Sequence, residues 1–578
     1  MSAWSYVALL KRQTTRHSDR LLAFVDALQR DEGLTILHQS ETLLVLGSRH
    51  LPHITLTSGR GIILGYLFEQ TSSTRVDTAS DQLDALAEDL LRTHWGGYVA
   101  LRTHHATPEV LRDPSGTLPC YHTAMDDVHI MTSIPRLFFD HGLKAAEIDW
   151  AMFAQSLVYR DIKAARTNLR EVHEILPGMA GRLFPSGLET RCVWSPWSFI
   201  TPAAGTATFE AAVDSVNRSV TTCLKAWGRC FNRPLVEVSG GLDSSIVAAG
   251  IASISDATAL TYAAIAGDPD ETPYAKAVAD HLGIALEVVL PQVDLIDITT
   301  SYAADLPRPY ARSFTQACDS AAAALAENRD ADAFFSGGGG DNVFCYLRSL
   351  SPAVDRMKVE GIGRGLLSTI SDLATLGETN IWNVAARTAR RMLRQPRSRW
   401  QRDERFLDPA AIAPLPIPFG HPWTEVPPSA LPGKVAHIYS LIHVQNHLEG
   451  HRRTRIAPLI SPLLSQPIME ACLSVPSWLW CSGGINRAVA RAAFASSLPR
   501  SIIARQSKGA FDSLTAQILS ANRPAFRELL LGGLLVDQHL VDTCAIEATL
   551  ALPMPDGEAM VRLWALADAE AWARAWAR

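Results

Sequence analysis

Two aspartates stand in glycine-rich turns that follow short apolar runs, and the first turn reads SGGLDSS at residues 239–245. The backbone N–H groups of Gly240 and Gly241, with the start of the helix expected after them, form a concavity that attracts phosphate. The turn lacks the lysine of a GxxxxGK[ST] loop and places Asp243 where a phosphate would sit. A carboxylate repels phosphate unless a divalent cation lies between them, and Mg²⁺ bridges such oxygens. The turn therefore predicts binding of a magnesium nucleotide. Three hydroxyl groups of the turn are expected to add hydrogen-bond donors: Ser239, Ser244 and Ser245.

A second turn of the same design occurs later in the chain. SGGGGDN at residues 336–342 follows the apolar run Ala333–Phe335 and carries Asp341. Parallel strands end at the same edge of a sheet, where two carboxylates can hold one metal ion. We therefore expect Asp243 and Asp341 to be both metal ligands and catalytic residues.

The elements that must position these turns alternate between strand and helix. After a helical stretch at 209–231 come the apolar strand before SGGLDSS, then TYAAIAG, the helical ETPYAKAVADHLG and the strand-like ALEVVL. This alternation predicts a parallel sheet flanked by helices. Residues 1 to about 200 instead contain short apolar runs separated by turn residues, which is typical of a β-rich domain. The predicted fold class is α/β, with a β-rich domain at 1–205 and a larger α/β domain at 206–578.

Composition limits the possible functions. The 578 residues exceed the size of a single core, so two or three domains are expected. A net charge of −6 argues against nucleic acid as the main partner. The nine scattered cysteines suit a reducing compartment and are expected to be buried thiols. The N-terminus has no apolar leader and no run of about 20 apolar residues occurs, which predicts a cytoplasmic protein without membrane insertion.

Several other patterns leave alternatives open. The arginine-rich segment Arg387–Arg405 is either a solvated helix face or a docking surface for an acidic peptide or partner. The proline-rich stretch Pro409–Pro432 is interpreted as an ordered loop or linker. His443, His447 and His451 recur every four residues, as on one helix face, where packing or contact with a peptide is favoured over zinc binding. The tryptophans of the C-terminal helix are assigned to packing.

The residues of the second half resemble a known family. SGGLDSS resembles the pyrophosphate loop of N-type ATP pyrophosphatases, which cleave ATP between its α and β phosphates, and the order of motifs resembles the asparagine synthetase family. TYAA with Ala264 matches the adenine-contacting strand, and Asp268–Asp270 match the segment after it. Residues 336–342 match the SGEGSDE turn, and Arg505–Lys508 match a late basic turn.

The resemblance implies ATP and Mg²⁺ as cofactors and assigns roles to individual residues. Lys508 is expected to be catalytic, because its charge would neutralise the phosphates in the transition state. Arg487 and Arg491, one turn apart in GGINRAVAR, either assist it or are surface helix charges. Asp270 and Glu271 either lie near the nucleotide or cap the next helix. The expected nucleotide-binding residues are Val238, Ser239, Gly240, Gly241, Leu242, Asp243, Ser244, Ser245, Ala264, Asp270, Glu271, Ser336, Gly337, Gly338, Gly339 and Arg487.

The first third resembles a class II glutamine amidotransferase-like domain through RDPSG (112–116), TSIPRLF (132–138) and EILPG (174–178). That domain uses an N-terminal cysteine as nucleophile. Here residue 2 is serine and the first cysteine is Cys120. We therefore expect a degenerate domain that does not hydrolyse glutamine.

One further departure narrows the resemblance. Gly338 stands where the synthetase turn has an acid and where β-lactam synthetases have a tyrosine. The GGGGDN turn, together with residues 458–494, resembles the lasso peptide cyclases. This resemblance implies that a side-chain Asp or Glu carboxylate of a core peptide is adenylated and then attacked by the N-terminal amine of the peptide. It also implies a precursor peptide as substrate, with a leader peptidase and a leader-recognition protein as partners.

Three alternatives remain from the sequence. The first is an asparagine-like or β-lactam-like synthetase for a small molecule, which the missing cysteine and Gly338 disfavour. The second is a nucleotide-binding pseudoenzyme or scaffold, which the presence of Asp243, Asp341 and Lys508 disfavours. The third is a tRNA-modifying pyrophosphatase, which would need a basic surface.

Overall fold

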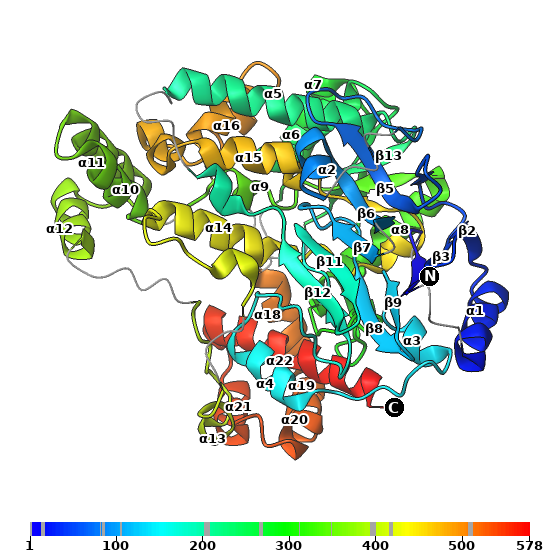
Figure 1. Cartoon of the computed structure of the whole chain (residues 1–578). Helices are drawn as coiled ribbons and strands as arrows, with labels where there is room; N and C mark the ends of the chain where they lie inside the picture. The colour runs from blue at the N-terminus through cyan, green and yellow to red at the C-terminus, as the bar shows by residue number, and fades with distance from the viewer. Residues whose placement is uncertain are drawn as a thin grey trace.

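The computed structural model of the chain describes residues 3–12, 18–80, 83, 87–104, 107–200, 208–264, 270–310, 312–347, 349–392, 400–415, 420–506 and 512–577. Its N-terminal part holds two antiparallel sheets, and its C-terminal part holds one parallel sheet among many helices (Figure 1). The predicted α/β fold class is confirmed.

The N-terminal sheets have six described strands each. In the first sheet the order is β10-β8-β9-β1-β3-β2, and in the second it is β12-β11-β7-β6-β5-β4. Alternating apolar residues pack between the sheets, where they join a core that continues into the C-terminal part. The strands are β1 (Tyr6–Lys11), β2 (Thr35–Gln39), β3 (Leu43–Gly47), β4 (His53–Thr55), β5 (Gly61–Glu69), β6 (His94–His104), β7 (Thr107–Arg112), β8 (Tyr121–Met125), β9 (Val128–Thr132), β10 (His173–Glu174), β11 (Met179–Phe184) and β12 (Gly187–Cys192). The helices of this part are α1 (Asp19–Asp31), α2 (Ala87–Thr93), α3 (Leu137–Asp140) and α4 (Trp150–Val158).

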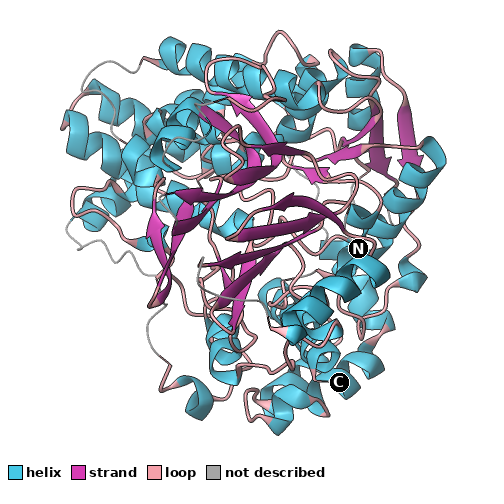
Figure 2. Cartoon of the chain, turned by 45° about the vertical axis from the view of Figure 1, so that its right-hand side comes forward, coloured by secondary structure: helices cyan, strands magenta, loops and turns pink. Residues whose placement is uncertain are grey.

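The C-terminal sheet has the order β15-β14-β13-β16-β17, and all its pairs are parallel. Figure 2 shows the strands of the chain in the interior of the molecule with helices around them. Its interior strands are short and almost entirely buried, as expected for a sheet covered on both faces. The strands are β13 (Pro234–Glu237), β14 (Thr258–Tyr262), β15 (Leu286–Val289), β16 (Ala333–Phe335) and β17 (Leu459–Ile460).

The predicted helix at 209–231 is α5 (Phe209–Gly228), which begins where the Thr208 hydroxyl accepts a hydrogen bond from the Ala211 N–H at 3.2 Å. Before it, 201–207 lie outside the described residues, so the boundary near 205 stays a prediction. The remaining helices are α6 (Leu242–Ala252), α7 (Thr272–Leu282), α8 (Gln316–Arg329), α9 (Gly340–Val343), α10 (Ser351–Glu360), α11 (Arg364–Leu376), α12 (Ile381–Met392), α13 (Pro409–Ile412), α14 (Pro432–Gln445), α15 (Gln466–Ser474), α16 (Ala488–Ala493), α17 (Arg500–Ala504), α18 (Asp512–Ala521), α19 (Arg523–Leu531), α20 (Leu534–Asp537), α21 (Thr543–Leu550) and α22 (Gly557–Trp576).

Helices α10, α11 and α12 form a group at one side of the molecule, with a small hydrophobic cluster of their own (Figure 1). Exposed arginines of the basic segment lie on α12, which leaves both interpretations of that segment open. The proline-rich stretch contains α13 and a single 3-10 turn at Pro422–Thr424, in accord with an ordered loop.

The C-terminal helix α22 packs as predicted. Its Trp564, Trp572 and Trp576 are at most 5% exposed. The Trp572 ring stacks on Phe153 of α4 with 5.5 Å between centroids. The last helix is thereby anchored to the N-terminal part. All nine cysteines are free; six are buried, whereas Cys192 and Cys544 are exposed, so the prediction of buried thiols is wrong for these two. No described helix is both long enough and apolar enough to cross a membrane.

Candidate active site

The two glycine-rich turns meet at one edge of the parallel sheet. Strand β13 leads into the first turn and β16 into the second, and the two strands pair in parallel with Val236 opposite Phe335. The turns therefore leave neighbouring strands in the same direction. This adjacency confirms that the two turns lie at one sheet edge, whereas the metal-binding and catalytic roles of the two aspartates stay predictions.

Glycine is required where the turns touch. A Cβ on Gly337 would lie 2.5 Å from the backbone nitrogen of Ser244, and one on Gly340 would lie 2.4 Å from the Cβ of Asp243. Gly240 has a φ of +65°, and a Cβ there would lie 2.2 Å from the Cβ of Tyr274. The second turn therefore packs its backbone directly on the start of α6, which brings the two aspartates together.

Arg487 joins the two carboxylates. Its Nη1 lies 2.8 Å from Asp243 Oδ2, 3.0 Å from Asp243 Oδ1 and 2.6 Å from Asp341 Oδ1. The Arg487 and Asp243 side chains are 9% and 10% exposed, and that of Asp341 is 28% exposed. The guanidinium also lies over the Tyr346 ring, 5.2 Å from its centroid. Arg487 is therefore not a surface helix charge.

The position of Arg487 tests whether a metal ion fits between the aspartates. One cationic nitrogen within 3.0 Å of both carboxylates shows that their oxygens converge on a single point of positive charge. Carboxylate oxygens are the ligands that Mg²⁺ prefers. The two residues therefore fit the predicted ion, although Arg487 has to move away for the ion to take that place.

The hydroxyls of the first turn make local hydrogen bonds. Ser245 Oγ donates to the Gly241 carbonyl at 2.7 Å, and the Ser239 and Ser244 hydroxyls lie 3.2 Å apart. The Ser239 backbone N–H donates to Ser244 Oγ at 3.3 Å. These bonds stabilise the turn, and donation to phosphate by the three hydroxyls stays a prediction.

Gly338 is the one glycine of the second turn with room for a side chain. A Cβ there would meet only the hydroxyls of Ser336 and Ser461, at 3.4 and 3.5 Å, which is ordinary van der Waals contact. The Ser336 hydroxyl accepts a hydrogen bond from the Gly338 N–H at 3.1 Å. The absence of a side chain at this position is thus not imposed by packing.

Arg505 is a residue of this site whose role the sequence did not indicate. Its Nη1 donates to the Ser239 carbonyl at 3.1 Å, and its Nη2 lies 2.7 Å from Glu271 Oε1. Its guanidinium stacks over the Tyr274 ring at 4.0 Å. Arg505 therefore ties the first turn to the start of α7. The only sequence signal was its place in the late basic turn.

Asp270 and Glu271 stand at the start of α7. The Asp270 carboxylate accepts a hydrogen bond from the Thr272 N–H at 2.9 Å, and the hydrogen bonds with Thr272 lower its pKa. Glu271 pairs with Arg505. Both residues therefore stand at a helix start, which is one of the two roles that the sequence left open. A contact with nucleotide, the other role, stays a prediction.

Arg491 does not face the two aspartates. It is buried, and its guanidinium donates to Asn486 Oδ1 at 3.0 Å and to the Ile503 and Arg505 carbonyls at 2.6 and 2.8 Å. Burial and then the charge of Arg487 lower its pKa. Arg491 holds the backbone around Arg487 and Arg505, so it positions these two residues without facing the aspartates itself.

A hollow lies beside the neighbouring strand ends. Ala264 follows β14 and is exposed there. It borders a cavity of about 560 Å³ whose other lining residues, 290–295, follow β15. The nucleotide sites of parallel sheets lie outside the carboxyl ends of strands. The cavity is therefore on the side expected for the base of a nucleotide whose phosphates sit at β13 and β16.

Some predicted residues fall outside the described ones: Ser2, Asp268 and the catalytic candidate Lys508. Val238 is buried and its N–H donates to the Leu260 carbonyl at 2.8 Å, which fixes the start of the first turn. Leu242 is also buried, and Gly339 directly precedes α9 as its N-cap. Their predicted contacts with nucleotide remain predictions.

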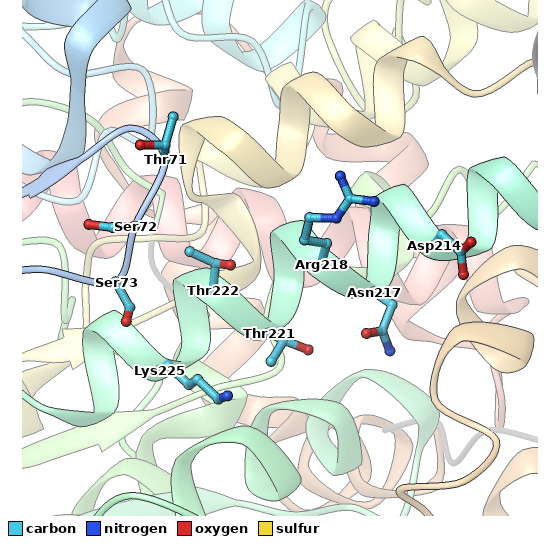
Figure 3. A pocket seen from close by; sticks show the side chains of 9 residues that line it. All are labelled: Thr71, Ser72, Ser73, Asp214, Asn217, Arg218, Thr221, Thr222 and Lys225. Atoms are coloured by element: carbon cyan, nitrogen blue, oxygen red, sulfur yellow. The ribbon is translucent and has the colours of Figure 1, made fainter.

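A second hollow, of about 520 Å³, lies on the outer side of α5 and contains no residue of either glycine turn (Figure 3). It is therefore distinct from the site of the two aspartates. It is polar and shallow, and it is lined by Thr71, Ser72, Ser73, Asp214, Asn217, Arg218, Thr221, Thr222 and Lys225.

Comparisons with known proteins give distant structural matches and a match to a family model. No curated protein matches the chain. One solved structure, titled the allosteric regulatory enzyme of purine biosynthesis, is 10% identical, covers 50% of this chain and 80% of its own, and has a TM-score of 0.22. Another, glutamine phosphoribosylpyrophosphate amidotransferase from B. subtilis complexed with ADP and GMP, is 12% identical, covers 50% and 66%, and has a TM-score of 0.21. Neither overlap is close enough to assign a fold or an activity.

The family model gives the decisive match. Residues 218–574 match the model described as asparagine synthase. This range contains both glycine turns, Arg487, Arg505 and the whole parallel sheet. The chain therefore belongs to the asparagine synthase family and is an ATP-dependent, amide-forming ligase.

Proposed function

We propose that this ligase is a macrolactam synthetase of the lasso peptide cyclase type. It adenylates an Asp or Glu side-chain carboxylate of a core peptide and joins it to the N-terminal amine of the same peptide, releasing AMP and pyrophosphate. The observation that carries the proposal is the open position at Gly338, beside the second aspartate, where a side chain would meet no close contact. A bulky peptide segment needs space at the place where smaller substrates need a contact.

The reaction needs two bond exchanges. A carboxylate oxygen of the peptide attacks the α phosphorus of ATP, and the bond from that phosphorus to the bridging oxygen breaks, so pyrophosphate leaves. The amine nitrogen then attacks the activated carbonyl carbon and loses a proton, and AMP leaves. The product is lighter than the linear peptide by one water.

The chain contributes position and charge to these steps. The N–H groups at the start of α6 point toward the departing pyrophosphate, and the helix dipole favours negative charge there. Asp243 and Asp341 would hold Mg²⁺, which supplies positive charge to the phosphates when bound. Arg487, displaced from the carboxylates, has a guanidinium suited to the phosphate oxygens.

Arg505 braces this site through the Ser239 carbonyl. That bond fixes the entrance of the first turn, so the N–H groups stay aligned while charge builds up on the phosphates. Arg505 is the first residue of the late basic turn, which ends at Lys508.

The proposal also covers partners and place of action. The amine of the core peptide becomes available only after a leader is removed, so a leader peptidase and a leader-recognition protein are proposed partners. A cytoplasmic location, where ATP and Mg²⁺ are abundant, is proposed with them.

The test supplies the protein with ATP, Mg²⁺ and a linear core peptide bearing a free amine. We expect AMP and pyrophosphate, measured by chromatography, and a product lighter by one water, measured by mass spectrometry. Formation of ADP would contradict the proposed bond cleavage. Turnover of small carboxylates with no peptide product would instead support the alternative of a small-molecule synthetase. Nucleotide binding without any turnover would support a scaffold.

The variants Asp243→Asn and Asp341→Asn serve as active-site controls. Each keeps the size of the side chain but removes a metal-binding charge, so AMP formation should fall on the order of 10²–10³-fold. Circular dichroism should show an unchanged fold. Near wild-type AMP formation in either variant would exclude that residue from the metal site.

A further inference from the structure

A cluster of metal-ligand side chains lies at the boundary between the two halves of the chain. Asp161 belongs to the loop after α4, whereas His443 is in the last turn of α14 and His447 is just beyond its end. The sequence placed His451 on the same helix face. That expectation is wrong, because α14 ends at Gln445 and His451 instead faces Asp319, with 3.7 Å between its Nδ1 and the Asp319 Oδ1.

The three remaining groups converge. His443 Nδ1 lies 3.3 Å from Asp161 Oδ2, and His447 Nε2 lies 3.7 Å from Asp161 Oδ1. One ligand atom from each residue lies within 4.8 Å of the other two. Ligands at zinc distances around a tetrahedral ion are separated by roughly 3.4 Å. Small side-chain rotations therefore suffice to place all three around one ion.

The burial of the cluster suits a metal ion. His447 Nε2 is buried and makes no hydrogen bond within the described part of the chain. A buried polar nitrogen without a hydrogen-bond partner carries a cost that a metal ion removes.

The surroundings include positive charges as well. Arg312 lies near Asp161 and His447, and it will lower the affinity for a cation. Lys163 is already paired with Glu449 and Glu174, which neutralise it. The His443 side chain is 44% exposed, so one side of the cluster is open to solvent.

We propose that Asp161, His443 and His447 bind one divalent ion of the zinc class, with a fourth position open to solvent. Two imidazoles and one carboxylate are a typical ligand set for such an ion, whereas Mg²⁺ prefers oxygen ligands alone. The ion would join the N-terminal part to α14. It is a separate site from the two aspartates, and it does not depend on the proposed peptide substrate.

Helix α14 connects this site to the second glycine turn. Asn342, the neighbour of Asp341, donates from Nδ2 to the Ser440 carbonyl at 2.8 Å, and Ser440 Oγ donates to the Asn342 carbonyl at 3.3 Å. Ser440 and His443 are one turn apart on α14, and His447 lies just beyond the end of this helix. An ion at the cluster would therefore restrain the helix that supports the active site.

The test uses the full chain, freed of metal with a chelator and titrated with Co²⁺ and then Zn²⁺. We expect one ion per chain, an intense visible absorption typical of tetrahedral Co²⁺, its loss when Zn²⁺ displaces Co²⁺, and a rise in Tm on the order of a few degrees. The absorption should disappear in His443→Gln, Asp161→Asn and His447→Ala. Because His443 is partly exposed, its variant should fold normally, as checked by circular dichroism.

Two matched controls separate this site from others. His451→Ala removes the next histidine along the chain and should keep the absorption. Asp243→Asn alters the oxygen site and should keep it too. Absence of the absorption in the wild type, its persistence in folded His443→Gln, or its loss in Asp243→Asn would overturn the proposal.

Discussion

At the residue scale, Arg487 balances the negative charge of the two active-site carboxylates. Without it, two carboxylates held close together would repel each other in a site with little water. One guanidinium nitrogen contacts both, and a left-handed backbone at Arg487, with φ of +53°, aims the side chain between them. The arginine therefore occupies the place that the proposed Mg²⁺ would take between the two carboxylates.

Replacing Arg487 with alanine should destabilise the protein when no metal is present. Removing one partner of a buried ion pair costs about 3 kcal/mol or more, because Asp243 and Asp341 lose the guanidinium that contacts both of them. Tm measured in a chelator should fall, and Mg²⁺ should restore more of it than in the wild type. Arg218→Ala, at an exposed arginine of α5, is the control and should change neither value. An unchanged Tm of Arg487→Ala in the chelator would contradict this role.

At the element scale, the second glycine turn contains two neighbouring glycines that differ in the space around them. A side chain would clash at one position and would fit at the other. Gly337 lies against the backbone of Ser244 at the start of α6, whereas a Cβ on Gly338 would make only ordinary van der Waals contacts. The constraint at 337 comes from packing two turns together. Packing does not require glycine at 338, so under the proposed function we assign this glycine to the space that the peptide needs.

The pair Gly337→Ala and Gly338→Ala tests this difference. A Cβ at 337 must push the two turns apart, and overpacking of this kind costs about 1–3 kcal/mol. We therefore expect Gly337→Ala to lower Tm and abolish AMP formation. Gly338→Ala should keep Tm and AMP formation, and Gly338→Glu should reduce cyclisation more than AMP formation by narrowing the space for peptide. An equal fall in Tm in both alanine variants would contradict the conclusion that packing requires glycine at 337 but not at 338.

At the scale of the whole molecule, a buried charge network joins the two parts of the chain. Glu174 is fully buried and pairs with Arg112 at 2.7 Å, with Lys163 at 3.6 Å and with Arg308 of the C-terminal part. Glu449 of the C-terminal part pairs in turn with Lys163 and accepts a hydrogen bond from Tyr121 at 2.6 Å. Burial raises the pKa of Glu174, but Lys163, Arg308 and Arg112 outweigh it and hold the pKa well below its usual value.

This network predicts a loss of stability in acid. A carboxyl whose pKa is lower in the folded state stabilises the fold above its unfolded pKa of about 4.3 and loses that contribution as pH falls. Tm should therefore drop steeply below about pH 5. Glu174→Gln should lower Tm at neutral pH, because three cations lose their partner, and should flatten the acid dependence. If Tm of Glu174→Gln fell in acid as steeply as Tm of the wild type, carboxyl groups other than Glu174 would cause the acid unfolding.

Much of the site follows from short-range sequence patterns. Apolar runs ending in glycine turns specify strands that deliver Asp243 and Asp341, and alternation of strands with helices specifies a parallel sheet whose strands end at one edge. The glycines also predict that the two turns approach each other closely, because only a residue without a side chain permits such close backbone contact. The sequence likewise predicted the packing of the C-terminal tryptophans from their helical spacing.

Other features depended on the tertiary structure, because they arise from contacts between distant segments. The position of Arg487 between the aspartates requires a loop more than a hundred residues away to reach the sheet edge, and no local pattern indicates this. The separation of His451 from His443 and His447 follows from where α14 ends, and Asp161 joins them only through packing of the two parts. Sequence by itself therefore predicted which groups would act on ATP, since spacing within a turn is local. The folded structure decided which cation stands between those groups and which space remains for the substrate, since side chains from separate elements must pack together to define both.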